Sequence, residues 1–351
     1  MRTRLIALAT ALATGALGLA GCGSGHDGSG SGSGLTEVVV ASSFTLPGTP
    51  IQIADDRGYF ADEGIRIRYE RIKSTSDAIP MLARGDVSAA TGSPSAGLYN
   101  ALAGGSDLRI VADAGTASPG HPLWYLTVRK DLVDSGKVKD FADLKGLKIA
   151  LPGPGTGFDR GLATALDKGG LSADDVEVVS PVAFPDMIVG MRNGSIDAAF
   201  MIQPLVASGA ADGTLVPMWN TVDIVGPQQE GFLMYSPQFA ADTETATAFM
   251  RAYLRGVRDY VGTFSEKPTL SPADARAVIA HVAEVTGVPV KALEMLTDAP
   301  GVSPEGTINA RDLAELQQFF VDNGSVKKPA DLDDFIDTSF VEAAAQQTGE
   351  K

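Results

Sequence analysis

The chain has 351 residues, of which 44% are hydrophobic, and a formal net charge of −15. This length supports two lobes of ordinary domain size, each with its own hydrophobic core. The acidic balance argues against nucleic acid or an anionic membrane surface as a partner, because both carry negative charge.

The N-terminal residues have the pattern of an export signal. Arg2 and Arg4 precede an apolar run over residues 5–19, which is too short to span a bilayer comfortably. We therefore expect residues 1–21 to be a signal peptide. Cys22 follows and is the only cysteine, so an intramolecular disulfide is excluded. Residues 22–34 then form a Gly/Ser-rich run, whose composition is typical of a flexible tether.

The next part of the chain alternates strands and helices. Buried strands are predicted over 38–41, 65–69 and 87–91, and helices over 50–57 and 77–84. Gly85 is expected to end the second helix. The order β-α-β-α-β favours an α/β fold in which a parallel sheet is covered by helices.

A second segment repeats this arrangement at a constant offset of 109 residues (186 − 77 = 109). The matching positions are Asp77 and Asp186, Ile79 and Ile188, Leu82 and Met191, Gly85 and Gly194, Val87 and Ile196, Ala89 and Ala198, and Ala90 and Ala199. One offset across a helix, its glycine stop and the following strand indicates two lobes built on one plan.

A glycine-rich turn in the second segment predicts a binding site. A strand over 148–151 leads into the turn at 152–157, and a helix over 158–166 follows. Free N–H groups at such a helix N-terminus can bind a small anion or a polarised oxygen. The nucleotide-binding patterns do not fit, because Gly-Lys-Ser/Thr is missing and Phe158 replaces the third glycine. An ordinary αβ turn remains the alternative.

Extended segments at Leu123–Val128 and Gly231–Tyr235 are expected to cross between the lobes, which would allow the lobes to close by a hinge. We therefore divide the chain into residues 35–124 as the first part of lobe 1, 125–230 as lobe 2, and 231–351 as the return to lobe 1. Helices are predicted in this last part over 243–264, 271–285, 309–324 and 331–347.

Several motifs resemble a known family. They are Asp56-Arg-Gly-Tyr-Phe60, Arg84-Gly-Asp86, Asp143-Leu-Lys-Gly146 and Asn193-Gly-Ser-Ile-Asp-Ala198. The chain is similar to the solute-binding proteins of ABC importers, in the group that binds aliphatic sulfonates, nitrate and taurine, together with the related thiamine-precursor binders. Leu19-Ala-Gly-Cys22 resembles the bacterial lipobox. Ile202-Gln203-Pro204 stands where the family often has Trp, an acid and Pro, which weakens any transfer of taurine or sulfonate chemistry.

The resemblance implies a two-lobe periplasmic-binding-protein fold of type II with two hinge crossings. It also implies a monomer that is lipid-anchored at Cys22, on the outer face of the cytoplasmic membrane or in the periplasm. An ABC permease and its ATPase would be its partners, along with a small-molecule ligand. No cofactor, metal or catalytic residue is expected.

Ligands of open α/β sheets bind beyond the carboxyl ends of the strands. The resemblance therefore implies a cleft lined by Ser43, Phe44, Leu46, Ser93, Ser95 and Thr116 from the first lobe, and by Gly155, Thr156, Gly157, Phe158, Phe184 and Gln203 from the second. The hydroxyls and helix N–H groups could bind an oxyanion or a ring carbonyl, and the aromatic rings could enclose a planar body. Helix caps and core residues are the alternatives. Glu230 is interpreted as a receptor for a ligand amine, or otherwise as a solvated loop carboxylate.

These observations favour the capture of a small organic anion, zwitterion or heterocycle, without catalysis. Two alternatives stay open. One is an enzyme on the same fold, resembling dehydratases or pyrimidine synthases, for which His121 is the candidate near the cleft. The other is a solute-sensing lipoprotein that contacts a receptor instead of a permease.

Overall fold

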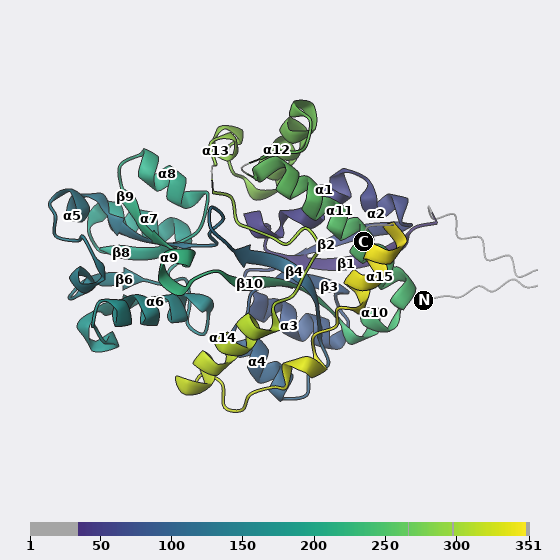
Figure 1. The fold of residues 1–351 in the computed structure, drawn as a ribbon, viewed down its shortest axis with the longest axis horizontal. Helices are drawn as coiled ribbons and strands as arrows, with labels where there is room; N and C mark the ends of the chain where they lie inside the picture. The colour runs from purple at the N-terminus through teal and green to yellow at the C-terminus, as the bar shows by residue number, and fades with distance from the viewer. Residues whose placement is uncertain (1–33, 266, 297, 349–351) are drawn as a thin grey trace, which may run out of the picture. The chain divides into compact units, whose positions relative to one another are not determined.

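The computed structural model of the protein describes residues 34–265, 267–296 and 298–348 (Figure 1). Leu35–Lys351 form one compact unit. The predicted signal peptide and Cys22, with all of the tether except Gly34, lie outside the described residues. Across the three described ranges, no helix combines the length and the apolar character needed to cross a bilayer.

The unit contains two five-stranded sheets, which confirms the predicted two-lobe α/β fold. The first sheet has the order β2-β1-β3-β10-β4 and consists of β1 (Thr36–Ser42), β2 (Ile65–Arg71), β3 (Ala89–Gly92), β4 (Arg109–Ala117) and β10 (Gln228–Tyr235). The second has the order β7-β6-β8-β5-β9 and consists of β5 (Tyr125–Arg129), β6 (Lys148–Ala150), β7 (Glu177–Val179), β8 (Ala198–Met201) and β9 (Leu215–Asn220). We call each sheet, with the helices packed on it, the first and the second lobe.

The strands run parallel within each βαβ unit, as predicted, but each sheet also contains an antiparallel strand. β10 lies antiparallel between β3 and β4, and β5 lies antiparallel between β8 and β9. β5 and β10 are the strands by which the chain enters one lobe from the other. All eight residues of β10 are buried. The two lobes are therefore each completed by a strand that follows a crossing.

The crossings lie earlier in the chain than predicted. The chain leaves the first sheet after Ala117 and already pairs in the second sheet at Tyr125. It returns after Val225 and pairs in the first sheet from Gln228. Leu123–Val128 and Gly231–Tyr235 thus belong largely to strands, because their apolar residues fill the two sheet interiors.

The internal repeat is confirmed in the bounds of its helices and strands and in its two glycine stops. Helices α3 (Thr75–Arg84) and α7 (Phe184–Asn193) have the same length, and the strands that follow them, β3 and β8, begin at the same spacing. Gly85 and Gly194 end the two helices with φ of 76° and 79°. Glycine adopts this left-handed conformation without the steric cost that a Cβ brings.

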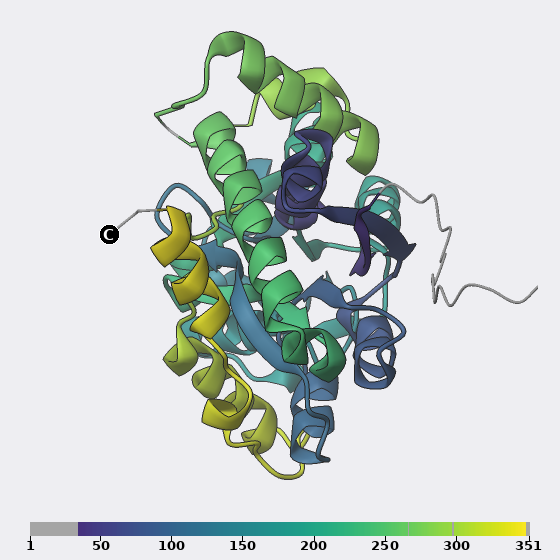
Figure 2. The same cartoon turned by 90° about the vertical axis from the view of Figure 1, so that its right-hand side faces the viewer.

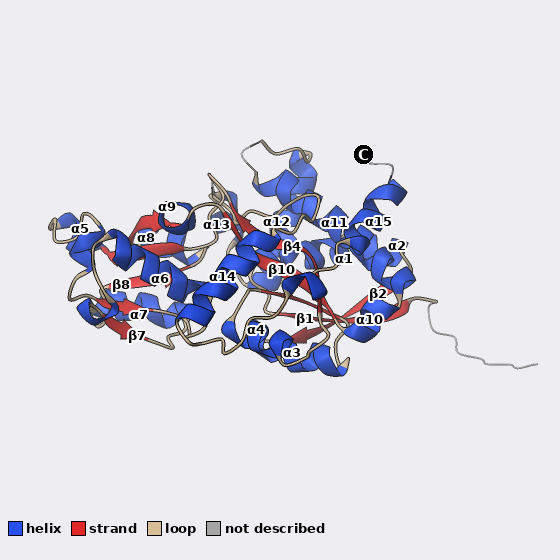
Figure 3. Cartoon of the chain, turned by 60° about the horizontal axis from the view of Figure 1, so that its bottom comes forward, coloured by secondary structure: helices blue, strands red, loops and turns tan. Residues whose placement is uncertain are grey.

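Helices cover both sheets (Figure 3). Those packed on the first lobe are α1 (Thr49–Asp56), α2 (Tyr59–Asp62), α4 (Ala96–Ala103), α10 (Pro237–Ala241), α11 (Thr243–Phe264), α12 (Pro272–Thr286), α13 (Val290–Glu294), α14 (Ala310–Asp322) and α15 (Ser339–Thr348) together with α3. Those of the second are α5 (Lys130–Asp134), α6 (Gly157–Lys168), α8 (Leu205–Ala211) and α9 (Thr221–Val225) together with α7.

The long helix α11 organises the core of the first lobe. Figure 2 shows it in green beside the yellow helix α15. Its bounds agree with the predicted 243–264, and Phe249, Tyr253 and Val257 are completely buried on it. Its aromatic residues are therefore core residues, as their helical spacing indicates.

The predicted last helix, 331–347, is wrong in its first half. Leu332–Asp334 form a short 3-10 turn, and α15 begins only at Ser339. Between them the backbone joins the edge of β4, because Ile110 donates to the Phe335 carbonyl (2.8 Å) and accepts from Asp337 (2.9 Å). These sheet-like bonds are incompatible with a continuous helix.

Candidate functional site

A cleft of about 480 Å³ lies between the two lobes. Residues of both sheets line it, beyond the carboxyl ends of β1, β3, β6 and β8. Eight residues that the sequence predicts for the site are among them: Ser43, Ser93, Ser95, Thr156, Gly157, Phe158, Phe184 and Glu230. The structure thus brings together predicted residues that are up to 187 positions apart (230 − 43).

The first lobe supplies a wall rich in hydroxyl groups, where α3 and α4 begin. Its hydroxyl-bearing residues are Ser43, Thr45, Ser74, Thr75, Ser76, Thr91, Ser93 and Ser95. Ser95 caps α4 by accepting the Leu98 N–H (3.2 Å), and Thr75 Oγ1 accepts the Ser93 N–H (2.9 Å). Each hydroxyl can still donate its own proton to a ligand oxygen. Lys73 adds a cation to the rim of this wall.

The second lobe supplies an aromatic wall. The ring of Phe158 lies 6.1 Å from that of Phe184 at an interplanar angle of 69°, and 6.0 Å from that of Trp124. These are ordinary edge-to-face and tilted spacings for aromatic pairs. All three side chains line the cleft. A planar or apolar ligand body would therefore pack against this side.

The glycine-rich turn differs from the predicted anion site. The carboxylate of Asp159 accepts the N–H groups of Gly155 (2.5 Å) and Thr156 (3.0 Å), two of the donors that were expected to face a ligand. Burial raises the pKa of Asp159, while these two hydrogen bonds act in the opposite direction. The next two N–H groups, those of Gly157 and Phe158, take no partner among the hydrogen bonds of the described residues.

Glu230 is brought to the cleft by a β-bulge. Gln229 pairs with Thr116 and Gly231 with Gly115, so that Glu230 has no partner on β4. Bulges redirect a side chain in this way, often beside functional sites. The Glu230 carboxyl accepts hydrogen bonds from Trp124 Nε1 (2.6 Å) and from the Gln228 amide. Burial raises its pKa from 4.5 to about 7. The hydrogen bond from Trp124 and the charge of Arg160 act to lower the pKa, but their effect is smaller.

The lobes touch directly beside the cleft. The Ala96 N–H donates to the Gly155 carbonyl (2.9 Å), and Ser95 and Thr156 pair as an isolated antiparallel bridge. Arg160 does not line the cleft. Its guanidinium donates to Gln228 (3.0 Å) and lies 3.5 Å from the Glu315 carboxylate on α14. The backbone of Gly155 therefore joins the lobes, and Arg160 connects α6 to the first lobe.

Four further predicted residues lie away from the cleft. The Phe44 ring packs 5.5 Å from that of Tyr69, with the Arg71 guanidinium 4.1 Å above it. Leu46 is buried in the core near Ile53 and Tyr260. Gln203 donates to Asp298 (3.0 Å). These three residues follow strands, as predicted, but their side chains contact other residues of the first lobe instead of the cleft.

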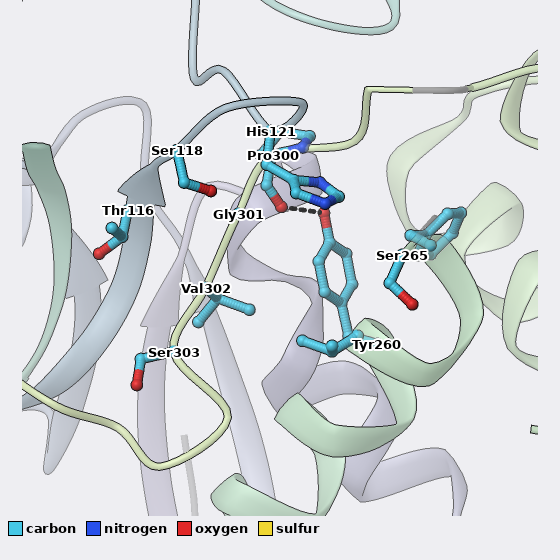
Figure 4. A pocket seen from close by; sticks show the side chains of 11 residues that line it. Thr116, Ser118, His121, Tyr260, Ser265, Pro300, Gly301, Val302 and Ser303 are labelled. Carbon is cyan, nitrogen blue, oxygen red and sulfur yellow. Dashed lines mark hydrogen bonds between the residues drawn. The ribbon is translucent and has the colours of Figure 1, made fainter. Parts of the chain in front are cut away.

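Thr116, the fourth, lines a separate pocket of about 230 Å³ with His121 (Figure 4). There the Tyr260 hydroxyl donates to the Pro300 carbonyl (3.0 Å), and His121 Nδ1 lies 3.0 Å from the Ala299 carbonyl. His121, which kept the enzyme alternative open, thus lies outside the interlobe cleft.

Sequence reasoning missed the N-terminus of α3 and Trp124. Ile72, Lys73, Ser74, Thr75 and Ser76 all line the cleft. The repeat contains the signal that could have found them, since Phe184, a predicted site residue, stands 109 positions after Thr75 and both begin equivalent helices. No comparable signal marks Trp124, which stands just before the strand that follows the outward crossing.

The two sheets, the two crossings and the cleft between them define a two-lobed binding-protein fold. Solved structures share it. The periplasmic aliphatic sulphonate binding protein SsuA from Escherichia coli is 17% identical, with a TM-score of 0.68 over 86% of this chain and 92% of that one. The periplasmic nitrate-binding protein NrtA from Synechocystis PCC 6803 is 13% identical, with a TM-score of 0.64 over 89% of each chain. The desulfurization enzyme DSZB is 17% identical, with a TM-score of 0.62 over 89% of this chain and 99% of that one.

A family model gives the more specific assignment. The NMT1/THI5-like model matches residues 48–263, which is more than half of the chain. The protein belongs to the NMT1/THI5-like family. The matched range includes β2 to β10 and every residue of the cleft discussed above except Ser43 and Thr45.

Proposed function

We propose that this protein is the extracytoplasmic solute-binding component of an ABC importer. It would capture a small organic anion, zwitterion or heterocycle between its lobes and present the closed form to a permease and its ATPase. The family, and the fold shared with SsuA and NrtA, support this proposal. The lipobox-like Leu19–Cys22 supports a lipid anchor at the outer face of the cytoplasmic membrane.

The observation that carries the proposal is the opposition of two chemically different walls across one cleft. Most of the hydroxyl-bearing residues that line it come from the first lobe, and the aromatic residues come from the second. Small-molecule sites have this character, with mostly apolar walls and a few polar groups that set the orientation. Neither wall encloses a ligand alone, so binding would favour lobe closure.

Thermal-shift screening tests the binding function. The probes are ethanesulfonate, taurine, nitrate, an aromatic carboxylate and an aminopyrimidine. A ligand that binds only the folded state raises the melting temperature, and a hundredfold excess over its dissociation constant adds about 2.7 kcal/mol of stability. Failure of every small-molecule class to shift the melting temperature would contradict the proposal. Loss of uptake on gene deletion would separate transport from sensing.

An enzyme on this fold is the second candidate. The likeness to DSZB favours it, as does a buried cleft carboxyl whose pKa of about 7 would suit a general base. Incubation of the protein with each bound probe, followed by mass spectrometry, distinguishes the two functions. Recovery of unchanged ligand supports binding alone, and a product that disappears in Glu230→Gln supports catalysis.

A further inference from the structure

Glu230 is a buried carboxyl without an ion-pair partner. Its residue is 8% exposed, and no ion pair within the described ranges includes it. Arg160, whose charge acts to lower the pKa of Glu230, makes its direct contacts with the Gln228 amide and with Glu315. Burying a charge is costly unless a counter-charge accompanies it. The charge of Arg160 acts on Glu230 without a direct ion pair, so a ligand cation would supply the contact partner that the ionised carboxyl lacks.

The surrounding structure holds this carboxyl at the cleft. The preceding residue, Gln229, donates its amide to Asp113 (2.7 Å) and its backbone N–H to Asp312 (2.8 Å), which fixes one side of the bulge. Trp124 and Gln228 fix the carboxyl itself. A carboxylate can accept about four hydrogen bonds, so capacity remains for a ligand donor.

Gly157 lies so close to the Glu230 carboxyl that a larger residue would crowd it. A Cβ at Gly157 would lie 3.3 Å from the Glu230 carboxyl carbon and from Oε1. Both residues line the cleft. The carboxyl thus lies beside the first turn of α6 and accepts a hydrogen bond from Trp124 of the aromatic wall, so a ligand that packs on this wall would come close to it.

We infer that Glu230 determines specificity, and that the cleft selects a small molecule with an ammonium, amidinium or amino N–H donor attached to an apolar or planar body. The inference rests on the proposed binding function and narrows it. Plain monoanions, such as nitrate or an alkanesulfonate without an amine, would meet the carboxyl as a repulsive group. A cationic or donor group supplies its missing partner.

Matched probe pairs test the inference by titration calorimetry at about pH 8, above the pKa of Glu230. The pairs are taurine and ethanesulfonate, benzylamine and benzyl alcohol, and 4-aminopyrimidine and 4-methylpyrimidine. In at least one pair the amino member should bind at least about tenfold more tightly, which corresponds to about 1.4 kcal/mol. Glu230→Gln should abolish that preference.

Glu177→Gln is the matched control, because it removes the same charge from the edge strand β7, where Glu177 pairs with Lys148. It should leave the preference unchanged. Gly157→Ala displaces the Glu230 carboxyl without removing its charge and should also weaken the preference, which provides a second variant if Glu230→Gln does not fold.

Three results would overturn the inference. Tighter binding of ethanesulfonate or nitrate than of the amino probes would do so while leaving the solute-binding function intact. Survival of the amino preference in folded Glu230→Gln would do the same. Absence of binding by every probe would count against both the inference and the proposed function.

Discussion

Helices α3 and α7 have the same length and a constant spacing in the chain, and both begin at the cleft, yet α3 begins with Thr75 and α7 with Phe184. Their C-terminal ends are equally alike, with a left-handed glycine in each. The repeat therefore reproduces the backbone frame and not the chemistry of the site. The first lobe contributes most of the hydroxyl groups and the second the aromatic rings, so a ligand bound as proposed would contact both.

The largest expected effect is a pH-dependent loss of stability caused by Glu230. This carboxyl follows the return crossing, whereas Trp124, which cannot ionise, follows the outward crossing. Burial raises the pKa of Glu230 from 4.5 to about 7, so the folded protein binds this proton more tightly than the unfolded chain. The protonated Glu230 carboxyl therefore contributes to the free energy of unfolding. This contribution is greatest below pH 4.5 and is lost as pH rises through about 7. The loss amounts to about 3 kcal/mol.

Urea denaturation across this pH range measures the effect. The wild-type protein should lose stability relative to Glu230→Gln as pH rises from about 4.5 to about 8, because the variant cannot ionise there. Parallel pH profiles for the two proteins would show that Glu230 is not buried as described.

The second prediction removes part of the aromatic wall. Phe184→Ala should weaken the binding of a planar probe by about tenfold or more, since it deletes apolar contact area worth about 1.5–3 kcal/mol. Phe141→Ala is the control, because that ring stacks 4.3 Å from Trp219 in the same lobe but outside the cleft. Equal losses in the two variants would mean that the effect comes from the stability of the lobe.

The third prediction tests the shared frame. Gly85→Ala and Gly194→Ala place a Cβ on residues with φ of 76° and 79°. Each should cost about 1–2 kcal/mol of unfolding free energy, measured by denaturant titration. Similar costs would support two lobes built on one plan. A large cost at one site and none at the other would show that the glycines have different roles.

The smallest expected effect concerns the hydroxyl wall. Thr75→Ala removes the acceptor of the Ser93 N–H, a hydrogen bond worth about 0.5–1.5 kcal/mol, together with a hydroxyl that faces the cleft. Probe affinity, measured by calorimetry, should fall several-fold. Thr75→Ser keeps the hydroxyl and should retain most of the affinity. Equal losses in both variants would point to the methyl group instead.

Sequence reasoning predicted the frame better than the site. The bounds of α11 and the spacing of α3, α7, β3 and β8 follow from hydrophobic periodicity and glycine stops, which act locally. The crossings were misplaced because a buried strand and an extended linker have the same local pattern. The break before α15 depends on bonds between Ile110 and residues 335–337, which no local pattern contains.

The site residues show the same division. Ser93, Thr156 and Phe184 were predictable because the carboxyl ends of strands face the cleft. Strand ends do not determine where a side chain points, and Gln203 turns to Asp298 across more than 90 residues of sequence (298 − 203 = 95). The free N–H groups expected at α6 depend on the rotamer of Asp159, which accepts two of them.

The most direct measurement is a crystal structure of the protein with the probe that raises its melting temperature most. The account predicts that one ligand molecule lies between Thr75 and Phe184, with a donor group on the Glu230 carboxyl. A ligand bound in the Tyr260 pocket, or one that contacts a single lobe, would contradict it.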